Sequence, residues 1–357
     1  MEELWEQNPY SMNHQEKTKY YQKRIQELTE KHEKNCTAYA NLLNQFNFSM
    51  DKTHKIEEYP FLPVRLFKES ELKSVKDEEV VKTMTSSGTS GQQVSKIYLD
   101  KATSTNQTKA LVKITSEFLG KKRLPMLIID SKNVVKNRKL FSARGAGILG
   151  FSMLGYDVTY ALDENMNLDF DTVYEFLEKH KEENIFLFGF TFMIWEHFYK
   201  TLASAAEHSV DLSKGILLHG GGFKKLQSEA VDNETYKKEL KRVCGIEKVY
   251  NYYGMVEQTG SIFMECEHGR LHASNFSDIF IRNPKDFSLC RQGEKGLIQL
   301  VSVLPESYPG HSILSEDVGE IIGEDDCPCG RCGKTFRIYG RIKQAEVRGC
   351  SDTYERK

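Results

Sequence analysis

Short apolar runs alternate with longer helical patterns through the middle of this chain of 357 residues. Four runs have the length and apolar character of buried strands: Met126–Ile129, Ile185–Phe188, Gly215–Leu218 and Lys248–Tyr252. Three segments between them have helical spacing: Leu168–Lys179, Phe192–Ala206 and Glu234–Val243. This alternation predicts an α/β fold in which helices cover a parallel sheet, and ligands bind such sheets at the carboxyl ends of the strands.

The two flanks of this region have a different texture. Residues 17–46 carry apolar side chains three and four positions apart, which predicts an amphipathic helical region. Pro60 and Pro63 then disfavour helix and indicate an extended connection. After about His272, the alternating segments Asp278–Arg282 and Gly296–Val303 predict a smaller, mostly antiparallel module.

A loop rich in hydroxyl groups precedes the predicted strands. Five Ser or Thr residues and two glycines occupy seven consecutive positions: Thr85, Ser86, Ser87, Gly88, Thr89, Ser90 and Gly91. Backbone N–H groups at glycine and side-chain hydroxyls both donate to phosphate oxygens, so the loop indicates a phosphate site. It lacks the Gly-Lys-Ser/Thr ending of a P-loop, and a flexible polar linker is the alternative interpretation.

Glycines and aromatic residues follow two of the predicted strands. Ile216–Leu218 leads into Gly220, Gly221 and Gly222, which allow a flat ring to lie against the backbone. A tight turn explains the same glycines equally well. The other strand leads into Tyr252, Tyr253, Gly254 and Glu257, a set that suits stacking on a base and holding Mg²⁺ on phosphate oxygens, although a solvated glutamate is the plain alternative.

The order of these motifs resembles the adenylate-forming superfamily of acyl-CoA synthetases and ligases. Asp317 before Val318-Gly319, and Tyr339-Gly340-Arg341, continue the series toward Gly349. The segment Tyr59–Lys68 and the pair Cys36 and Tyr39 are most similar to the acyl-protein synthetases (LuxE type) within it. The resemblance implies the large N-terminal domain of that superfamily, with parallel-rich sheets layered with helices plus a small β module. Because the chain stops at Lys357, we expect the usual mobile C-terminal domain to be absent.

The resemblance implies an enzyme, an ATP-dependent acid–thiol ligase that activates a fatty acid, long-chain in that family, as acyl-adenylate. By motif, residues 85–91 hold the β- and γ-phosphates, Gly220–Gly222 with Tyr252, Tyr253 and Gly254 frame adenine, and Glu257 binds Mg²⁺. Asp317 is assigned to the ribose and Arg341 to the ribose or a phosphate. The lysine that the superfamily carries in its C-terminal domain has no counterpart, so either Lys96, Lys343 or Arg341 supplies the charge or the reaction tolerates its absence.

A cysteine near the end of the chain, Cys350, follows Arg348 and Gly349. In the family resembled, such a cysteine accepts the acyl group as a thioester and passes it to an acyl-CoA reductase-type partner. An arginine two residues away favours the reactive thiolate, so Cys350 is the expected acceptor. An incidental exposed thiol is the alternative.

Three of the eight cysteines crowd into the segment Cys327–Cys332. Clustered thiols separated by turn residues are typical of structural zinc sites. The candidate ligands are Cys266, His268, His272, Cys327, Cys329 and Cys332. We favour Cys266, Cys327 and Cys329 with either Cys332 or a histidine as the fourth ligand, and ordinary reduced cysteines are the alternative.

An aromatic run brackets Gly189 where a strand is predicted to meet a helix. Its members are Phe186, Phe188, Phe190, Phe192, Met193 and Trp195. The run can line an apolar pocket for the acyl group, shaped by Gly145, Gly147 and Gly150 near Arg144. Plain core is the expected role of at least half of these residues.

A net charge of −2 argues against a broad nucleic-acid or membrane surface. No apolar run resembles a signal peptide or a membrane span, so the expectation is a soluble, cytoplasmic protein. We expect four segments: a helical region at 1–84, an α/β nucleotide-binding core at 85–272, a β module with the cysteine cluster at 273–340 and a short tail at 341–357. The rival functions are a carboxylate–CoA ligase of the phenylacetate–CoA ligase type and a non-catalytic nucleotide-binding module.

Overall fold

The computed structural model describes residues 1–86, 93–136, 143–205, 207–223 and 228–342. These residues form two compact units. Unit 1 takes its described residues from 1–86, 93–114 and 254–342, and unit 2 takes its own from 115–253. The chain leaves unit 1 within helix α5 (Lys101–Leu119) and returns after strand β8 (Lys248–Tyr253). The four predicted segments follow one another along the chain, whereas unit 1 combines parts that are distant in sequence. The boundaries of the four segments stay predictions.

Unit 2 is built on a parallel sheet, which confirms the predicted α/β class. Its strands follow the order β8-β7-β6-β4-β5. Their bounds are β4 Leu124–Ser131, β5 Gly155–Leu162, β6 Ile185–Phe190, β7 Gly215–Gly220 and β8 Lys248–Tyr253. The four predicted strands are all present, whereas β5 was not predicted. It is an edge strand with Tyr156 and Val158 exposed, so it lacks the continuous apolar run of a buried parallel strand.

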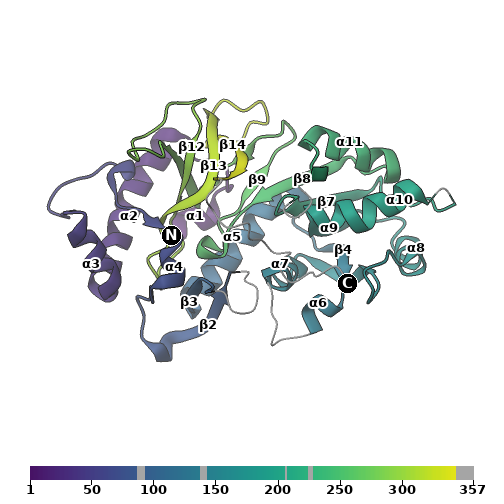
Figure 1. Ribbon diagram of the computed structural model, residues 1–357, viewed down its shortest axis with the longest axis horizontal. Coiled ribbons are helices and arrows are strands. Elements are labelled where there is room, and N and C mark those ends of the chain that lie inside the picture. The colour runs from purple at the N-terminus through teal and green to yellow at the C-terminus, as the bar shows by residue number, and fades with distance from the viewer. Residues whose placement is uncertain (87–92, 137–142, 206, 224–227, 343–357) are drawn as a thin grey trace. The chain divides into compact units, whose positions relative to one another are not determined.

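Helices surround the strands of unit 2 (Figure 1). They are α6 Asn133–Lys136, α7 Ala143–Ser152, α8 Phe170–Lys179, α9 Thr191–Met193, η4 Ile194–Tyr199, α10 Lys200–Ser204 and α11 Asn233–Cys244. The predicted helices are confirmed, and side-chain caps fix two of their starts: Asp169 accepts from the Thr172 N–H and Asp232 from the Thr235 N–H. The predicted segment 192–206 contains one π-helical stretch, η4.

Unit 1 contains an antiparallel sheet in the order β11-β12-β13-β14-β10-β9, which confirms the predicted character of this part of the chain. Strand β1 pairs with β13 in parallel, and β2 and β3 form a separate hairpin. The bounds are β1 Leu62–Pro63, β2 Val80–Thr85, β3 Lys96–Asp100, β9 Phe263–Glu265, β10 Leu271–His272, β11 Ser277–Arg282, β12 Gly296–Ser302, β13 Ser312–Glu324 and β14 Lys334–Arg341.

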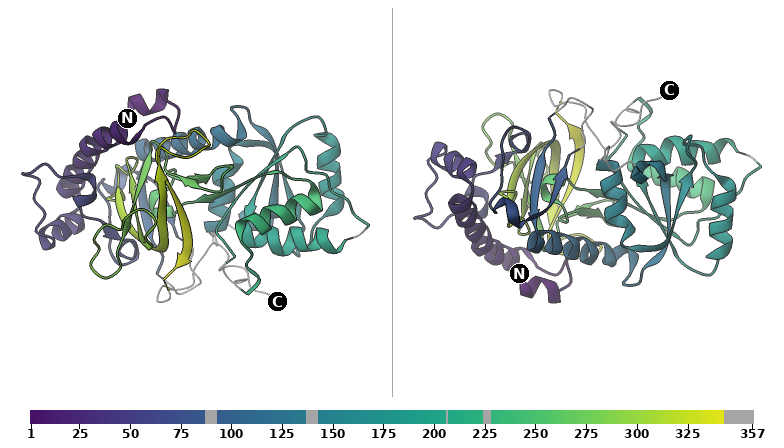
Figure 2. Two further views of the ribbon diagram at one scale, coloured as in Figure 1. Left: turned by 90° about the horizontal axis from the view of Figure 1, so that it is seen from above. Right: turned by 90° about the horizontal axis from the view of Figure 1, so that it is seen from below.

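The N-terminal helices of unit 1 lie beside β12 and β13, although they are distant from these strands in sequence (Figures 1 and 2). The helical segments are α1 Glu2–Glu6, α2 His14–Asn35, α3 Thr37–Gln45, η1 Ile56–Glu58, α4 Leu66–Glu69, η2 Asp77–Glu79 and η6 Val256–Gln258. The helical pattern predicted at 17–46 is interrupted at Cys36, which is extended and packs in the core with Tyr39 and Leu43. None of the described helices combines the length and apolar character needed to cross a bilayer.

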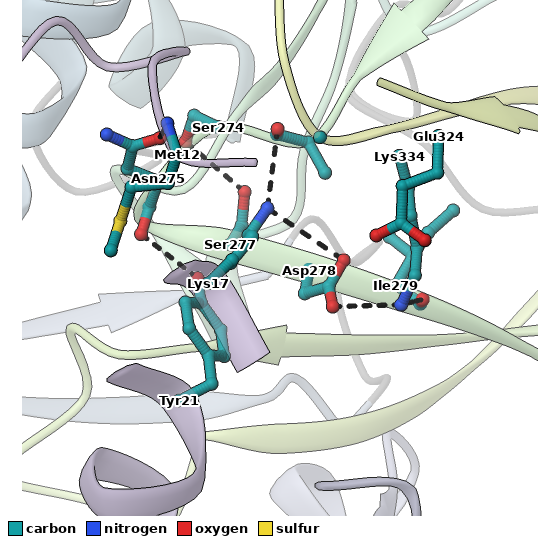
Figure 3. A network of polar contacts seen from close by, with 12 residues as sticks. Met12, Lys17, Tyr21, Ser274, Asn275, Ser277, Asp278, Ile279, Glu324 and Lys334 are labelled. Carbon is teal, nitrogen blue, oxygen red and sulfur yellow. Dashed lines mark hydrogen bonds and ion pairs between the residues drawn. The ribbon is translucent and has the colours of Figure 1, made fainter. Parts of the chain in front are cut away.

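A buried charge network ties α2 to the sheet of unit 1 (Figure 3). The Lys334 ammonium group donates to Asp278 Oδ2 at 2.9 Å, and Lys17 Nζ lies 3.9 Å from Asp278 Oδ1. Burial opposes ionisation of Asp278, but Lys334 and Lys17 outweigh it and hold the pKa of this carboxyl below its usual value. Burial lowers the pKa of Lys17, and Asp278 opposes that shift. Asp278 is therefore the counter-charge on which two buried cations depend.

Replacing Asp278 with Asn should cost about 3–5 kcal/mol in the free energy of unfolding, because both ammonium groups lose their counter-charge. Lys17→Met is the matched control, expected to cost about 1 kcal/mol or less, since Asp278 keeps Lys334 as a partner. Both losses of stability can be measured by urea unfolding followed by tryptophan fluorescence in a Trp195→Phe background. Trp5, stacked on Phe276 in unit 1, is then the sole tryptophan. Equal losses in the two variants would contradict the assignment.

Candidate functional site

The parallel register of unit 2 aligns one row of residues at the carboxyl ends of its strands. Phe190 on β6 is level with Gly220 on β7, and Gly220 is level with Tyr252 on β8. A Cβ atom on Gly220 would lie only 2.7 Å from Tyr252 Cε1 and 2.8 Å from the Tyr252 carbonyl oxygen. Glycine is thus required here by the close approach of Tyr252, and the predicted adenine residues Gly220 and Tyr252 are neighbours.

The next two glycines have backbone conformations that favour glycine. Gly221 has φ of 85° and Gly222 has φ of 63°, both in the left-handed region. Both residues are exposed, and Tyr253 is half-buried. A glycine backbone without side chains at the end of a parallel sheet suits contact with a flat ring, so the geometry is compatible with the predicted adenine contact.

A buried histidine lies directly before these glycines, and sequence reasoning gave it no role. His219 Nδ1 is 2.9 Å from Thr191 Oγ1, and the Thr191 hydroxyl also donates to the Gly220 carbonyl at 3.1 Å. Burial lowers the pKa of His219 to about 3, so the ring is neutral. The Thr191–His219 pair thereby braces the strand end that carries the glycines. Its only sequence signal is the position of His219 beside the glycine run.

The predicted aromatic run is buried throughout. Phe186, Phe188, Phe190, Phe192, Met193 and Trp195 are at most 6% exposed. Phe188 stacks on Phe151 with ring centroids 4.4 Å apart, and Phe151 lies 5.1 Å from the ring of Tyr252. The run is therefore part of an aromatic core that reaches the strand ends, as the core interpretation expects.

Unit 1 contains the base of the hydroxyl loop. Thr85 and Lys96 pair across the β2–β3 hairpin. The Ser86 N–H donates to the Ser95 carbonyl at 3.2 Å, and the Ser95 N–H donates to Ser86 Oγ at 2.9 Å. The predicted residues Ser87, Gly88, Thr89, Ser90 and Gly91 lie outside the described residues. The hairpin thus holds the two ends of the loop side by side.

Glu257 is the buried carboxyl of unit 1 that the sequence assigned to Mg²⁺. Burial raises its pKa, and the Ser95 hydroxyl, Lys68 and Arg341 partly offset that shift. The backbone here is held in place because the Tyr308 hydroxyl donates to the Glu257 carbonyl at 2.9 Å. Sequence reasoning missed Ser95, whose buried hydroxyl becomes informative only when folding places it near Glu257. A buried carboxylate of this kind is stabilised by a cation, which fits the predicted role.

Asp317 and Arg341 face each other across neighbouring strands. They are directly paired in the β13–β14 register, and Arg341 Nε lies 3.6 Å from Asp317 Oδ1. The Asp317 N–H donates to Ser315 Oγ at 3.2 Å. The two predicted ribose and phosphate residues are therefore brought together by strand pairing. Gly254 belongs to the same unit, and a Cβ atom there would lie 3.1 Å from Ile262 Cγ2.

Four of the predicted metal ligands converge in unit 1. The ligand atoms of Cys266, His272, Cys327 and Cys329 all lie within 4.8 Å of one another. Cys266 follows β9, His272 lies on β10, and the other two occupy the turn between β13 and β14. The pairing of β10 with β9 and β14 brings these distant segments together. His268 and Cys332 lie outside this set, and the Cys332 N–H instead donates to the Tyr10 carbonyl at 2.9 Å.

The spacing of these atoms fits a tetrahedral zinc site. Zinc–sulfur bonds of about 2.3 Å at tetrahedral angles place two sulfurs about 3.8 Å apart. Cys266 Sγ and Cys327 Sγ are 3.8 Å apart, and Cys329 Sγ is 3.4 Å from His272 Nε2. Burial raises the pKa of Cys266 and lowers that of His272 to about 4, so the cluster would bring a neutral imidazole to a metal. The donor set fits Zn²⁺, and its occupancy stays a prediction.

The remaining predicted site residues, Lys343 and Cys350, lie outside the described residues. Lys96 is described and exposed at the start of β3.

The fold is that of the adenylate-forming ligases. A crystal structure of 2-hydroxyisobutyryl-CoA ligase in an open conformation, with 2-HIB-AMP and CoA, has a TM-score of 0.69 and 14% identity. The similarity covers 94% of this chain and 77% of that chain. The same ligase in its postadenylation state with 2-HIB-AMP also has a TM-score of 0.69, with 15% identity over 94% of this chain and 70% of that one.

Residues 2–357 match the family model described as acyl-protein synthetase, LuxE. The chain therefore belongs to the LuxE family of acyl-protein synthetases. A long-chain-fatty-acid–luciferin-component ligase from Aliivibrio fischeri is 24% identical over 311 residues, covering 84% of this chain and 79% of the relative. The protein with the same description from Vibrio harveyi is 22% identical, covering 83% and 77%.

Purified protein should contain about one zinc per chain by plasma mass spectrometry, because four ligand atoms converge in a closed set. Cys327→Ser should lose the metal, whereas Cys332→Ser, a matched control from the same turn region, should retain it. Substituted Co²⁺ should give thiolate charge-transfer absorption in Cys332→Ser and not in Cys327→Ser. Zinc-free wild type, or equal loss in both variants, would overturn this assignment.

Proposed function

We propose that this chain activates a long-chain fatty acid with ATP and transfers the acyl group to a cysteine thiol. In the first step the carboxylate attacks the α-phosphorus of ATP, an acyl–AMP bond forms, and pyrophosphate leaves. In the second step a thiolate attacks the acyl carbon, a thioester forms, and AMP leaves with one former carboxylate oxygen. The thioester then delivers the acyl group to a reductase.

The family match over residues 2–357 carries this proposal. The curated relatives are described as ligases of long-chain fatty acids, which supports a long aliphatic acid as the substrate. The fold supports ATP use, because the structural neighbours were captured with acyl-AMP ligands.

We assign the contact with adenine to residues of unit 2. Gly220 has no side chain beside Tyr252, and Gly221 and Gly222 present backbone at the end of β7. Tyr252 and Tyr253 add aromatic faces for stacking. The neutral His219 and Thr191 hold this strand end in place.

We assign the contacts with the phosphates and the ribose to residues of unit 1. Thr85 and Ser86 begin the phosphate loop, Asp317 accepts from the ribose hydroxyls, and Arg341 donates to ribose or phosphate. Glu257 would hold Mg²⁺, which when bound neutralises phosphate charge as pyrophosphate leaves. Lys96, Arg341 or Lys343 would supply positive charge in the adenylation step. Positioning and charge neutralisation then account for the catalysis.

Cys350 is the proposed acyl acceptor on this chain. Arg348 two residues away favours its thiolate. The reductase partner follows from the same proposal, since a thioester is an activated acyl group that a reductase can accept.

One observation favours a second candidate, a carboxylate–CoA ligase. The structural neighbours are CoA ligases, and one contains CoA. In that case free CoA replaces the cysteine as the thiol in the second step.

Wild-type protein should catalyse exchange of labelled pyrophosphate into ATP only when a fatty acid is present, because exchange reports the reversible first step. Glu257→Gln should slow this exchange roughly 100-fold through loss of charge stabilisation. Glu306→Gln is the control, since Glu306 pairs with Arg24 and Lys31, and none of the three has an assigned role. Absence of exchange across acids of varied chain length would exclude the ligase and favour a non-catalytic nucleotide-binding module.

Cys350→Ser should keep fatty-acid-dependent exchange but lose covalent labelling by radiolabelled fatty acid and ATP. The label on wild type should be released by neutral hydroxylamine, as thioesters are. Cys290→Ser, which removes a partly exposed thiol elsewhere, should label normally. Labelling of Cys350→Ser would contradict Cys350 as the acceptor, and product formation that requires added CoA would support the second candidate.

A further inference from the structure

Helix α7 of unit 2 lies over the carboxyl ends of three parallel strands. Arg144 Nε is 3.2 Å from Asp130 Oδ2 on β4. A Cβ atom on Gly147 would lie 3.1 Å from Phe190 Cζ on β6, and Phe151 packs on Tyr252 of β8. The spacing 144, 147 and 151 places all three residues on one helix face. This face therefore covers the row in which the adenine residues lie.

Arg144 is a buried cation that contacts Asp130 and Met193 among the described residues. It is 7% exposed, and Asp130 is fully buried. Besides the ion pair with Asp130, the guanidinium places Nη1 3.6 Å from the Met193 sulfur. Arg144 Nε and Asp130 Oδ2 lack a well-aligned hydrogen bond within the described part of the chain. Since a guanidinium carries five N–H donors and a thioether is a weak acceptor, the contacts with described residues leave donor capacity in an apolar setting.

The surroundings of this pair are apolar and aromatic. Met193 and Phe188 are fully buried, and Phe190 is 3% exposed. The Phe188 ring lies 5.8 Å from that of Phe190 and 4.4 Å from that of Phe151. A charged donor next to an apolar wall is suited to an amphiphile with an anionic head.

The charge of the pair favours a singly charged head group. Asp130 already neutralises Arg144, so a polyphosphate would meet no net positive charge here, whereas one carboxylate can share the planar fork of the guanidinium. Burial raises the pKa of Asp130 to about 6, although Arg144 opposes the shift. With this raised pKa, Asp130 takes up a proton more readily than an ordinary aspartate, which eases the arrival of a second carboxylate.

We infer that Arg144 binds the carboxylate of the fatty acid and that Asp130 positions its guanidinium. This inference rests on the proposed function and names the residue by which the acid is recognised. Arg144 is a substrate-binding residue, and Asp130 acts through it.

The first test measures binding of dodecanoic acid and of dodecanol to the full chain without ATP. Arg144→Gln should weaken binding of the acid roughly 10- to 100-fold, as expected for loss of a charge-assisted hydrogen bond, and leave dodecanol binding unchanged. Arg144→Lys should restore part of the affinity for the acid. The double variant Asp130→Asn/Arg144→Gln leaves no unpaired charge in the core, so it guards against misfolding and should lose the same preference. Arg123→Gln, which changes an exposed arginine of the same unit, is the control.

The second test follows pyrophosphate exchange, in which Arg144→Gln should raise KM for the acid by a similar factor and leave KM for ATP unchanged. Equal weakening of acid and alcohol, an unchanged acid affinity, or failure of wild type to bind the acid would overturn the inference. If the wild-type protein binds the acid but does not catalyse exchange, the proposed function is wrong. The binding test then still decides whether Arg144 recognises the carboxylate.

Discussion

Parallel strand pairing is the constraint on which the candidate site depends. The register of β6, β7 and β8 places Phe190, Gly220 and Tyr252 in one row, and the continuing β4 ladder brings Asp130 to the same end of the sheet. The glycine at position 220 is needed because Tyr252 approaches it closely. Helix α7 covers this row through Arg144, Gly147 and Phe151, so one sheet end carries both the proposed nucleotide contact and the proposed acid contact.

Three buried carboxyls differ in how many cations accompany them, and their pKa shifts follow. Asp278 has two lysines, which lower its pKa despite burial. Asp130 has one arginine, and burial raises its pKa to about 6. The Ser95 hydroxyl, a backbone N–H, Lys68 and Arg341 all lower the pKa of Glu257, but burial again prevails and raises it. The first is a structural network held by two cations, whereas the other two are sites that a ligand or a metal ion would stabilise.

The sequence predicted the α/β sheet well because buried parallel strands are continuous apolar runs, unmistakable between helical patterns. It missed β5, whose exposed side chains break that run. The cysteines of the predicted metal site were identified by their clustering, yet the choice of His272 over Cys332 depends on the pairing of β10 with β14, which no local pattern reports. Ser95, Thr191 and Asp130 were missed for the same reason, since only tertiary structure shows that they lie beside Glu257, His219 and Arg144.

The central claim is that the carboxylate is activated as an adenylate. Its most direct test supplies a fatty acid with ¹⁸O in both carboxylate oxygens, together with ATP and hydroxylamine to trap the acyl group. Attack at the acyl carbon of an acyl-adenylate leaves one labelled oxygen on AMP, so the account predicts AMP containing ¹⁸O. Label in inorganic phosphate, or AMP without label, would contradict it.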